Sequence, residues 1–84
     1  MINPYNFIND YNLSLSEEDF KQLQVDDITS ILVYNICVLN DDISRSTANM
    51  KCPVVINPQT RNAKQLILED SSYEFKYPFS KLIN

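Results

Sequence analysis

The 84-residue sequence contains no histidine, no glycine and no tryptophan. Without histidine, the chain lacks the side chain that most often acts as a general base near neutral pH and most often binds metals. Without glycine, no loop can use that residue to bring its backbone close to phosphate groups. We therefore expect no catalytic residue, no metal site and no bound cofactor, and we expect that the protein is not an enzyme.

Two further features are scarce. No apolar run approaches the length of a membrane span, and no signal-peptide pattern opens the chain. Seven basic residues stand against eleven acidic ones, giving a net charge of −4, and the basic residues form no cluster. Nucleic-acid surfaces need clustered Lys and Arg. The sequence therefore predicts a cytoplasmic protein that binds neither nucleic acid nor membrane directly, while a basic protein partner is permitted.

The residues that could carry chemistry are few. Cys37 and Cys52 lie in apolar runs without a CxxC spacing, which favours buried reduced thiols over a disulfide or a reactive thiol. Acidic pairs stand at 26–27, 41–42 and 69–70. Neighbouring residues on an extended chain point to opposite faces, so these pairs are interpreted as solvated turns, not as paired carboxylates.

What is present indicates one small folded domain over residues 1–84. Apolar residues make up 44% of the chain, too many for a disordered segment, although so short a chain has a thin core. Ser16 followed by three acidic residues predicts a helix from Glu17 to about Leu23. Phe20 and Leu23 are expected to face inward, with Leu15 and Phe20 spaced as a hydrophobic staple.

The remaining apolar segments read as strands. Residues 10–15 alternate like a half-buried strand, and residues 30–39 are apolar on both faces, which predicts a central strand covered on both sides. Residues 48–56 alternate again, and Pro53 places an edge or a bulge there. The residues expected to point together from this strand are Ala48, Met50, Cys52, Val54 and Ile56.

A hairpin follows. Residues 57–60 suit a type I turn, and a strand from Lys64 to Glu69 should turn Leu66 and Leu68 inward. Ten asparagines are expected to fill the positive-φ positions that glycine usually takes. The aromatic stripe after the hairpin predicts a final extended segment packed on the core, or else a surface taken by another chain; its members are Tyr73, Phe75, Tyr77 and Phe79.

Together these elements predict an all-β fold, a small antiparallel barrel-like sheet of four or five strands with one short helix. The ordered pieces also resemble the C-terminal half of the flagellar assembly factor FliW family over roughly residues 2–77. The matching segments are Asn3-Pro4-Tyr5, Asp10-Tyr11, residues 15–20, residues 30–39, Thr47-Ala48-Asn49-Met50, residues 53–57 and residues 64–73.

The chain departs from the family pattern in two places. Ala63 stands where family members usually carry glycine in the hairpin loop, which makes Asn62 a candidate for the left-handed position. The N-terminal half of the family domain has no counterpart, so we expect either a shortened product or a fragment. An edge strand left open would recruit another chain. We therefore expect a homodimer, or a higher oligomer, in which strands from two chains complete a barrel, with the aromatic stripe as a candidate strand for donation.

The resemblance implies a protein-binding role. Family members antagonise the RNA-binding translational regulator CsrA, which relieves repression of flagellin mRNA translation, and they bind flagellin in a partner switch. The alternatives are a flagellin chaperone without regulator contact, a truncated member without activity, and a small hydrolase. On this chain the residues expected to contact partners are Gln59, Arg61, Lys64, Gln65 and Tyr73.

Overall fold

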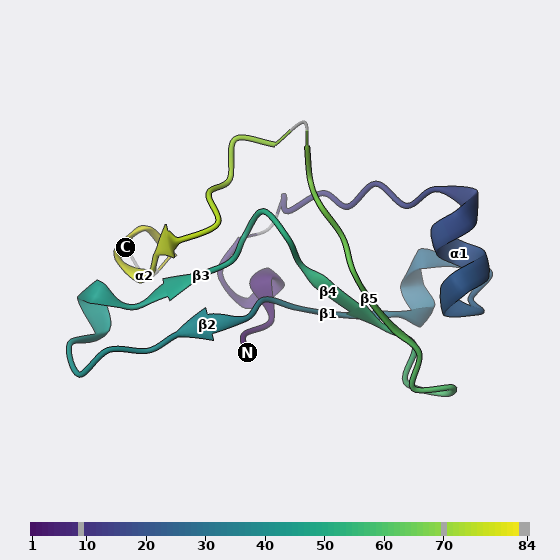
Figure 1. Cartoon of the computed structure of the whole chain (residues 1–84), viewed down its shortest axis with the longest axis horizontal. Coiled ribbons are helices and arrows are strands. Elements are labelled where there is room, and N and C mark those ends of the chain that lie inside the picture. Colours follow the sequence, from purple (N-terminus) through teal and green to yellow (C-terminus); the bar gives the residue numbers. More distant parts are fainter. Residues whose placement is uncertain (9, 70, 83–84) are drawn as a thin grey trace.

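A computed structural model describes residues 1–8, 10–69 and 71–82. They form an elongated molecule with extents of 39 × 25 × 18 Å, with α1 near one end and α2 near the other (Figure 1). The helices are η1 (Pro4–Asn6), α1 (Glu17–Leu23), η2 (Ile28–Ser30), η3 (Ile43–Arg45) and α2 (Phe79–Leu82). The strands are β1 (Leu32–Tyr34), β2 (Cys37–Val38), β3 (Thr47–Ala48), β4 (Val54–Ile56), β5 (Ala63–Gln65) and β6 (Tyr77–Pro78).

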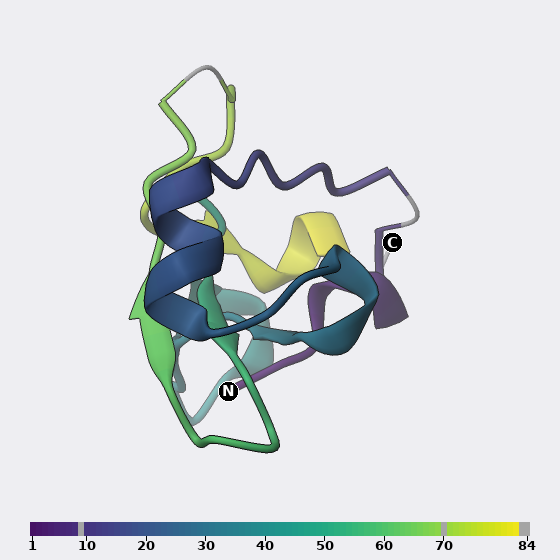
Figure 2. The same ribbon diagram turned by 90° about the vertical axis from the view of Figure 1, so that its right-hand side faces the viewer.

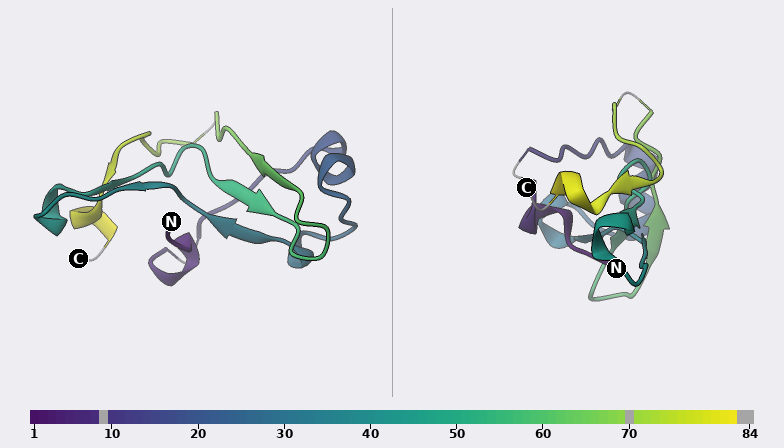
Figure 3. Two further views of the ribbon diagram at one scale, coloured as in Figure 1. Left: turned by 60° about the horizontal axis from the view of Figure 1, so that its bottom comes forward. Right: turned by 90° about the vertical axis from the view of Figure 1, so that its left-hand side faces the viewer.

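The strands build two antiparallel three-stranded sheets, in the orders β1–β4–β5 and β2–β3–β6. Because β1 leads into β2 and β3 leads towards β4, the two sheets follow one another as a single long ribbon (Figure 3). Val33 pairs with Val55 in the first sheet, and Cys37 pairs with Ala48 in the second. The predicted class, antiparallel sheet with a short helix, is confirmed; within the described residues the sheets do not close into a barrel.

The prediction that residues 30–39 form a central strand covered on both faces was wrong. The segment divides into β1 and β2, and each lies at the end of its sheet's strand order. The odd-numbered Val33 and Asn35 are buried, whereas Leu32, Ile36 and Val38 are 43%, 47% and 61% exposed. An antiparallel sheet can leave one face open while the other packs on the core. Here only one face is covered.

The strand expected over residues 48–56 is interrupted. Met50 N–H bonds to the carbonyl of Ala48, and Cys52 N–H bonds to the side chain of Asn49, both at 3.0 Å. Pro53, which has no N–H to donate, completes the break before β4. The break shifts the alternation by one residue, because a one-residue slip exchanges the two faces of a strand.

The consequence is a second correction. Ala48, Met50 and Cys52 are buried as predicted, but in β4 the buried residue is Val55, at 0% exposure. Val54 and Ile56 are half-buried and lie on the opposite face. Downstream, Leu66 and Leu68 are buried as predicted, although β5 itself is shorter than the strand expected there.

The helix prediction was correct in its bounds and its cap. Ser16 and Asp19 form a reciprocal capping box, in which each side chain accepts a hydrogen bond from the other residue's backbone N–H. Leu23 is 1% exposed and Phe20 packs against the core. Gln24 caps the C-terminus of the helix and adopts a left-handed conformation with φ 58°. Figure 2 shows α1 lying beside the hairpin strand β5.

The centre of the core is polar at one point. The buried Tyr11 hydroxyl donates to the carbonyl of Met50 and accepts a 3.2 Å hydrogen bond from the Asn35 amide. Burial raises the pKa of Tyr11 to about 12, so the phenol remains a donor. Around Tyr11, Leu13 and Leu15 are half-buried, which confirms the alternation expected for residues 10–15, although this segment joins no sheet.

The C-terminal aromatic segment packs on its own chain. Tyr73 stacks edge-on against Tyr11 with ring centroids 5.2 Å apart, and Tyr77 continues the row at 5.6 Å from Tyr73. β6 pairs with β3, and Phe79 is buried at the start of α2. The alternating spacing of the stripe predicted that Phe75 packs with the other aromatic residues, but its side chain is 58% exposed. The core-packing alternative is confirmed for Tyr73, Tyr77 and Phe79, and the expected homodimer stays a prediction.

Within the described part of the chain, no helix has the length and apolar character required to cross a membrane.

Candidate partner-binding surface

The loop of the β4–β5 hairpin is a compact turn held by its own backbone. Asn57 N–H bonds to the carbonyl of Asn62, and Arg61 N–H bonds to the carbonyl of Asn57, both at 2.8 Å. The Asn57 side chain also accepts from Gln59 N–H at 3.0 Å. The closing bond from Arg61 spans four residues, so the loop is one residue wider than the predicted type I turn.

The left-handed position of this loop is Arg61, with φ 64°, and not Asn62 as predicted. The other positive-φ residue in the described chain is Gln24. The expectation that asparagines fill these positions was therefore wrong for the residues described. The Asn62 side-chain amide instead donates a hydrogen bond to the carbonyl of Gln22 at 3.3 Å.

Asn57 joins the hairpin to the end of α1. Its side-chain amide, in a residue only 3% exposed, donates to the carbonyls of Leu23 at 2.8 Å and Gln24 at 3.2 Å. The last carbonyls of a helix have no hydrogen-bond donor within the helix, and the Asn57 amide supplies one. Sequence reasoning placed Asn57 only as a turn residue, because the helix end it bonds to lies more than thirty residues earlier in the chain.

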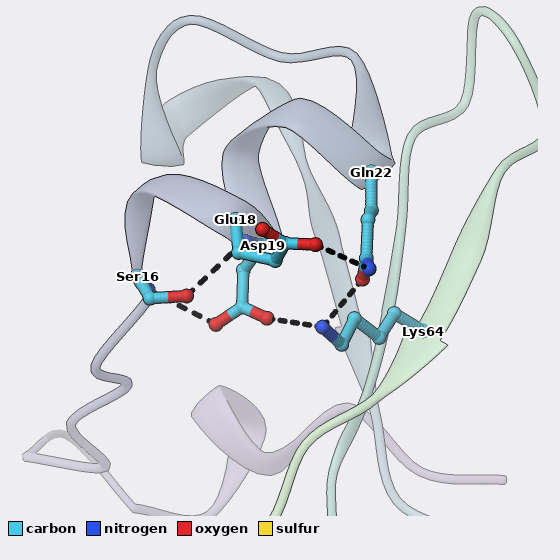
Figure 4. A network of polar contacts seen from close by, with 5 residues as sticks. All are labelled: Ser16, Glu18, Asp19, Gln22 and Lys64. Carbon is cyan, nitrogen blue, oxygen red and sulfur yellow. Dashed lines mark hydrogen bonds and ion pairs between the residues drawn. The ribbon is translucent and has the colours of Figure 1, made fainter.

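A charged network extends the same contact (Figure 4). The Lys64 ammonium on β5 pairs with the Asp19 carboxylate and donates to the Gln22 side-chain carbonyl. Gln22 in turn donates to Glu18 at 3.2 Å. The hydrogen bond from Lys64, and then those from Ser16, lower the pKa of Asp19 below its ordinary value. We call the contacts of Asn57, Asn62 and Lys64 with α1 the helix–hairpin latch.

The structure separates the predicted partner residues into three situations. Gln59 and Arg61 are exposed together on the hairpin loop, which the latch holds in place. Lys64 is half-buried and its ammonium is paired with Asp19, and its role in binding a partner stays a prediction. Gln65 is exposed on the outer side of β5, with its amide bonded to the Cys52 carbonyl at 3.2 Å.

Tyr73 lies elsewhere, in an open groove of about 630 Å³ between residues 10–14 and 67–73. Asp10 and Glu69 contribute acidic side chains to the groove wall. Burial, and secondarily the nearby Asp10 carboxylate, raises the pKa of the Tyr73 phenol. Tyr73 lines this groove, whereas the residues of the hairpin loop do not.

The described residues offer little bond-making chemistry. They contain no group of three or more Cys, Asp or Glu side chains placed to hold a metal ion. Both cysteines are free, with Cys52 buried and Cys37 half-buried, and burial raises the pKa of the Cys37 thiol. Asp27 and Asp42 cap the short helices η2 and η3, as turn residues would. Asp70, from the third acidic pair, lies outside the described residues.

Comparison with known proteins adds a family to this geometry. Residues 1–79 match the model of the FliW protein family. The flagellar assembly factor FliW of Thermoanaerobacter pseudethanolicus is 38% identical over 78 residues, which is 93% of this chain and 52% of the relative. The FliW of Bacillus subtilis is 33% identical, over 93% of this chain and 54% of the relative.

A solved structure agrees with the sequence matches. The crystal structure of a flagellar assembly factor FliW superposes with a TM-score of 0.82 at 31% identity, over 92% of this chain and 55% of that one. The chain thus spans about half the length of the curated relatives it matches. With the family model covering nearly all of it, the chain belongs to the FliW family.

Proposed function

We propose that this chain acts in flagellar assembly as a protein-binding factor. It would antagonise a CsrA-type RNA-binding regulator, relieve repression of flagellin mRNA translation, and exchange that partner for flagellin. The observation that carries the proposal is the hairpin loop, whose exposed Gln59 and Arg61 are held by a latch to α1. A pre-ordered loop loses less conformational freedom on binding than a flexible one.

Charge supports a protein partner over RNA. The chain carries −4 overall, and two of its seven basic side chains, Lys64 and Lys81, are already paired with acids. An acidic protein can compete for a basic regulator but gains little from phosphate groups. On this proposal the protein works in the cytoplasm, where the regulator and newly made flagellin are found, without a cofactor and without catalysis.

Binding is tested by mixing the chain with a purified CsrA-type regulator and a labelled flagellin mRNA leader in a gel-shift assay. We expect increasing amounts of the chain to release the RNA, and flagellin added afterwards to restore the regulator–RNA band. Direct retardation of the RNA by this chain, or a regulator–RNA band unchanged at saturating chain, would contradict the antagonist role. Capture of flagellin without any effect on the regulator would leave the chaperone alternative.

The loop is tested with a matched pair of arginines. Arg61→Ala removes the exposed cation of the loop, whereas Arg45→Ala removes the other arginine, exposed on η3. We expect Arg61→Ala, alone or with Gln59→Ala, to weaken regulator binding, and Arg45→Ala to leave it unchanged. Tyr73→Phe tests whether the groove binds the partner, because it removes only the phenol hydroxyl. Equal binding by all variants would move the partner surface away from these residues.

A further inference from the structure

The Asn57 side chain uses both its oxygen and its amide inside the fold. The oxygen accepts from the N–H of Gln59 at 3.0 Å, and the amide donates to the carbonyls of Leu23 at 2.8 Å and Gln24 at 3.2 Å. An asparagine amide carries two hydrogens, so each of the two carbonyls has a donor. One side chain therefore shapes the hairpin loop and also ties it to the end of α1.

The two loop residues expected to contact a partner both bond to Asn57. The N–H of Gln59 bonds to its side-chain oxygen, and the N–H of Arg61 bonds to its backbone carbonyl at 2.8 Å. Gln59 and Arg61 are exposed, whereas Asn57 is only 3% exposed and offers a partner almost no surface. Any effect of Asn57 on binding must therefore act through the conformation of the loop.

Aspartate at this position would separate the two roles of the side chain. It has nearly the same shape and keeps an oxygen that accepts from the N–H of Gln59, but it has no amide to donate. Its carboxylate would face the carbonyl oxygens of Leu23 and Gln24, which the native amide satisfies. Removing the donor from a buried acceptor is costly. The loop would keep its turn but lose this attachment to α1.

We infer that Asn57 is a positioning residue for partner binding. Its amide holds the loop against α1 in one orientation, and that orientation sets the affinity of Gln59 and Arg61 for the regulator. This role rests on the proposed function and deepens it, because it assigns control of binding to a residue that does not touch the partner. A loop that populates its binding orientation for only part of the time binds more weakly by that fraction.

The first test compares two asparagine-to-aspartate substitutions by isothermal titration calorimetry with a purified CsrA-type regulator. We expect Asn57→Asp to weaken binding by about tenfold at neutral pH. Asn40→Asp is the matched control, because the exposed Asn40 amide also donates to a backbone carbonyl, that of Arg45, at 2.9 Å. It adds the same charge away from the hairpin loop, so binding should stay within about twofold of the native value.

The second test is a double-mutant cycle with Arg61→Ala. A positioning residue acts through the side chains that it positions, so Asn57→Asp should cost only about twofold in affinity once the Arg61 side chain is removed. A residue that only stabilises the fold would give the same loss in both backgrounds.

Circular dichroism at the assay temperature checks that each variant is folded. Where Asn57→Asp unfolds the chain, Asn62→Ala breaks the latch more mildly, because it removes only the 3.3 Å bond from the Asn62 amide to the carbonyl of Gln22. We expect Asn62→Ala to weaken regulator binding in the same direction as Asn57→Asp but by less.

Three results would overturn this role of Asn57. Native affinity in the folded latch variants would show that the orientation of the loop does not depend on these bonds. Equal losses in the native and Arg61→Ala backgrounds would make Asn57 a structural residue alone. A native chain that does not bind the regulator would overturn the proposed function and this role with it, so the titration of the native chain distinguishes the two failures.

Discussion

Which residues of β4 face the core can be tested by making the same substitution, valine to alanine, at two neighbouring positions. Val54 and Val55 are neighbours on one strand, yet Val55 is fully buried and Val54 lies half-buried on the opposite face. Truncation to alanine removes two methyl groups at either site. For Val55 the transfer cost is about 1.6 kcal/mol at roughly 0.8 per group. The cavity left in the core raises the expected loss to about 2–3 kcal/mol.

For Val54→Ala we expect a loss below about 1 kcal/mol, because the site keeps solvent access. The assay is urea unfolding followed by tyrosine fluorescence, at the same low protein concentration for both variants. A difference of this size should separate the two midpoints clearly in so small a domain. Equal midpoints, or a larger loss for Val54→Ala, would refute the one-residue shift at the break before β4.

Three further outcomes are expected. Leu68→Ala should lower the free energy of unfolding by roughly 2–5 kcal/mol, because Leu68 is 8% exposed, whereas Gln59→Ala should be nearly neutral in the same urea assay; equal effects would contradict the burial of Leu68. Asp19→Asn should destabilise the chain by about 1 kcal/mol at neutral pH. Because folding lowers the pKa of Asp19, its contribution to stability is present above the unfolded-state pKa of roughly 4 and is lost as the pH falls through the folded-state pKa. The urea midpoints of the variant and the native chain should therefore converge in acid. A constant difference between the midpoints would contradict the pairing of Asp19 with Lys64. Cys37 should react with iodoacetamide more slowly than a free thiol near pH 8, because burial raises its pKa; mass spectrometry showing rapid labelling at Cys37 would oppose this.

Local signals in the sequence predicted the helix and the hairpin well. Ser16 and Asp19 lie within one turn of each other, and the two hairpin strands are separated by a short loop, so neighbouring residues decide both structures. The break at residues 49–53 was different. Its Asn49 side chain replaces a strand partner for Cys52, and alternation alone gives no sign of that exchange.

The candidate surface was predictable only in part. Turn chemistry identified Gln59 and Arg61 as exposed, as the structure places them. Spacing could not show that Lys64 meets Asp19, because that contact depends on how α1 packs against β5. Residues 30–39 were misread for a related reason, because a segment that is apolar on both sides does not show whether the same chain covers both sides.

Both left-handed residues in the described part of this glycine-free chain bond to Asn57. The Asn57 side-chain amide donates to the carbonyl of Gln24, and the Asn57 backbone carbonyl accepts from the N–H of Arg61. A left-handed conformation costs a non-glycine residue roughly 1–2 kcal/mol. Rupture of the Asn57 contacts would relax both residues in the same event, so loop and helix end should open as one cooperative unit. Their amides would then exchange with solvent at a shared opening free energy, below that of the rest of the core.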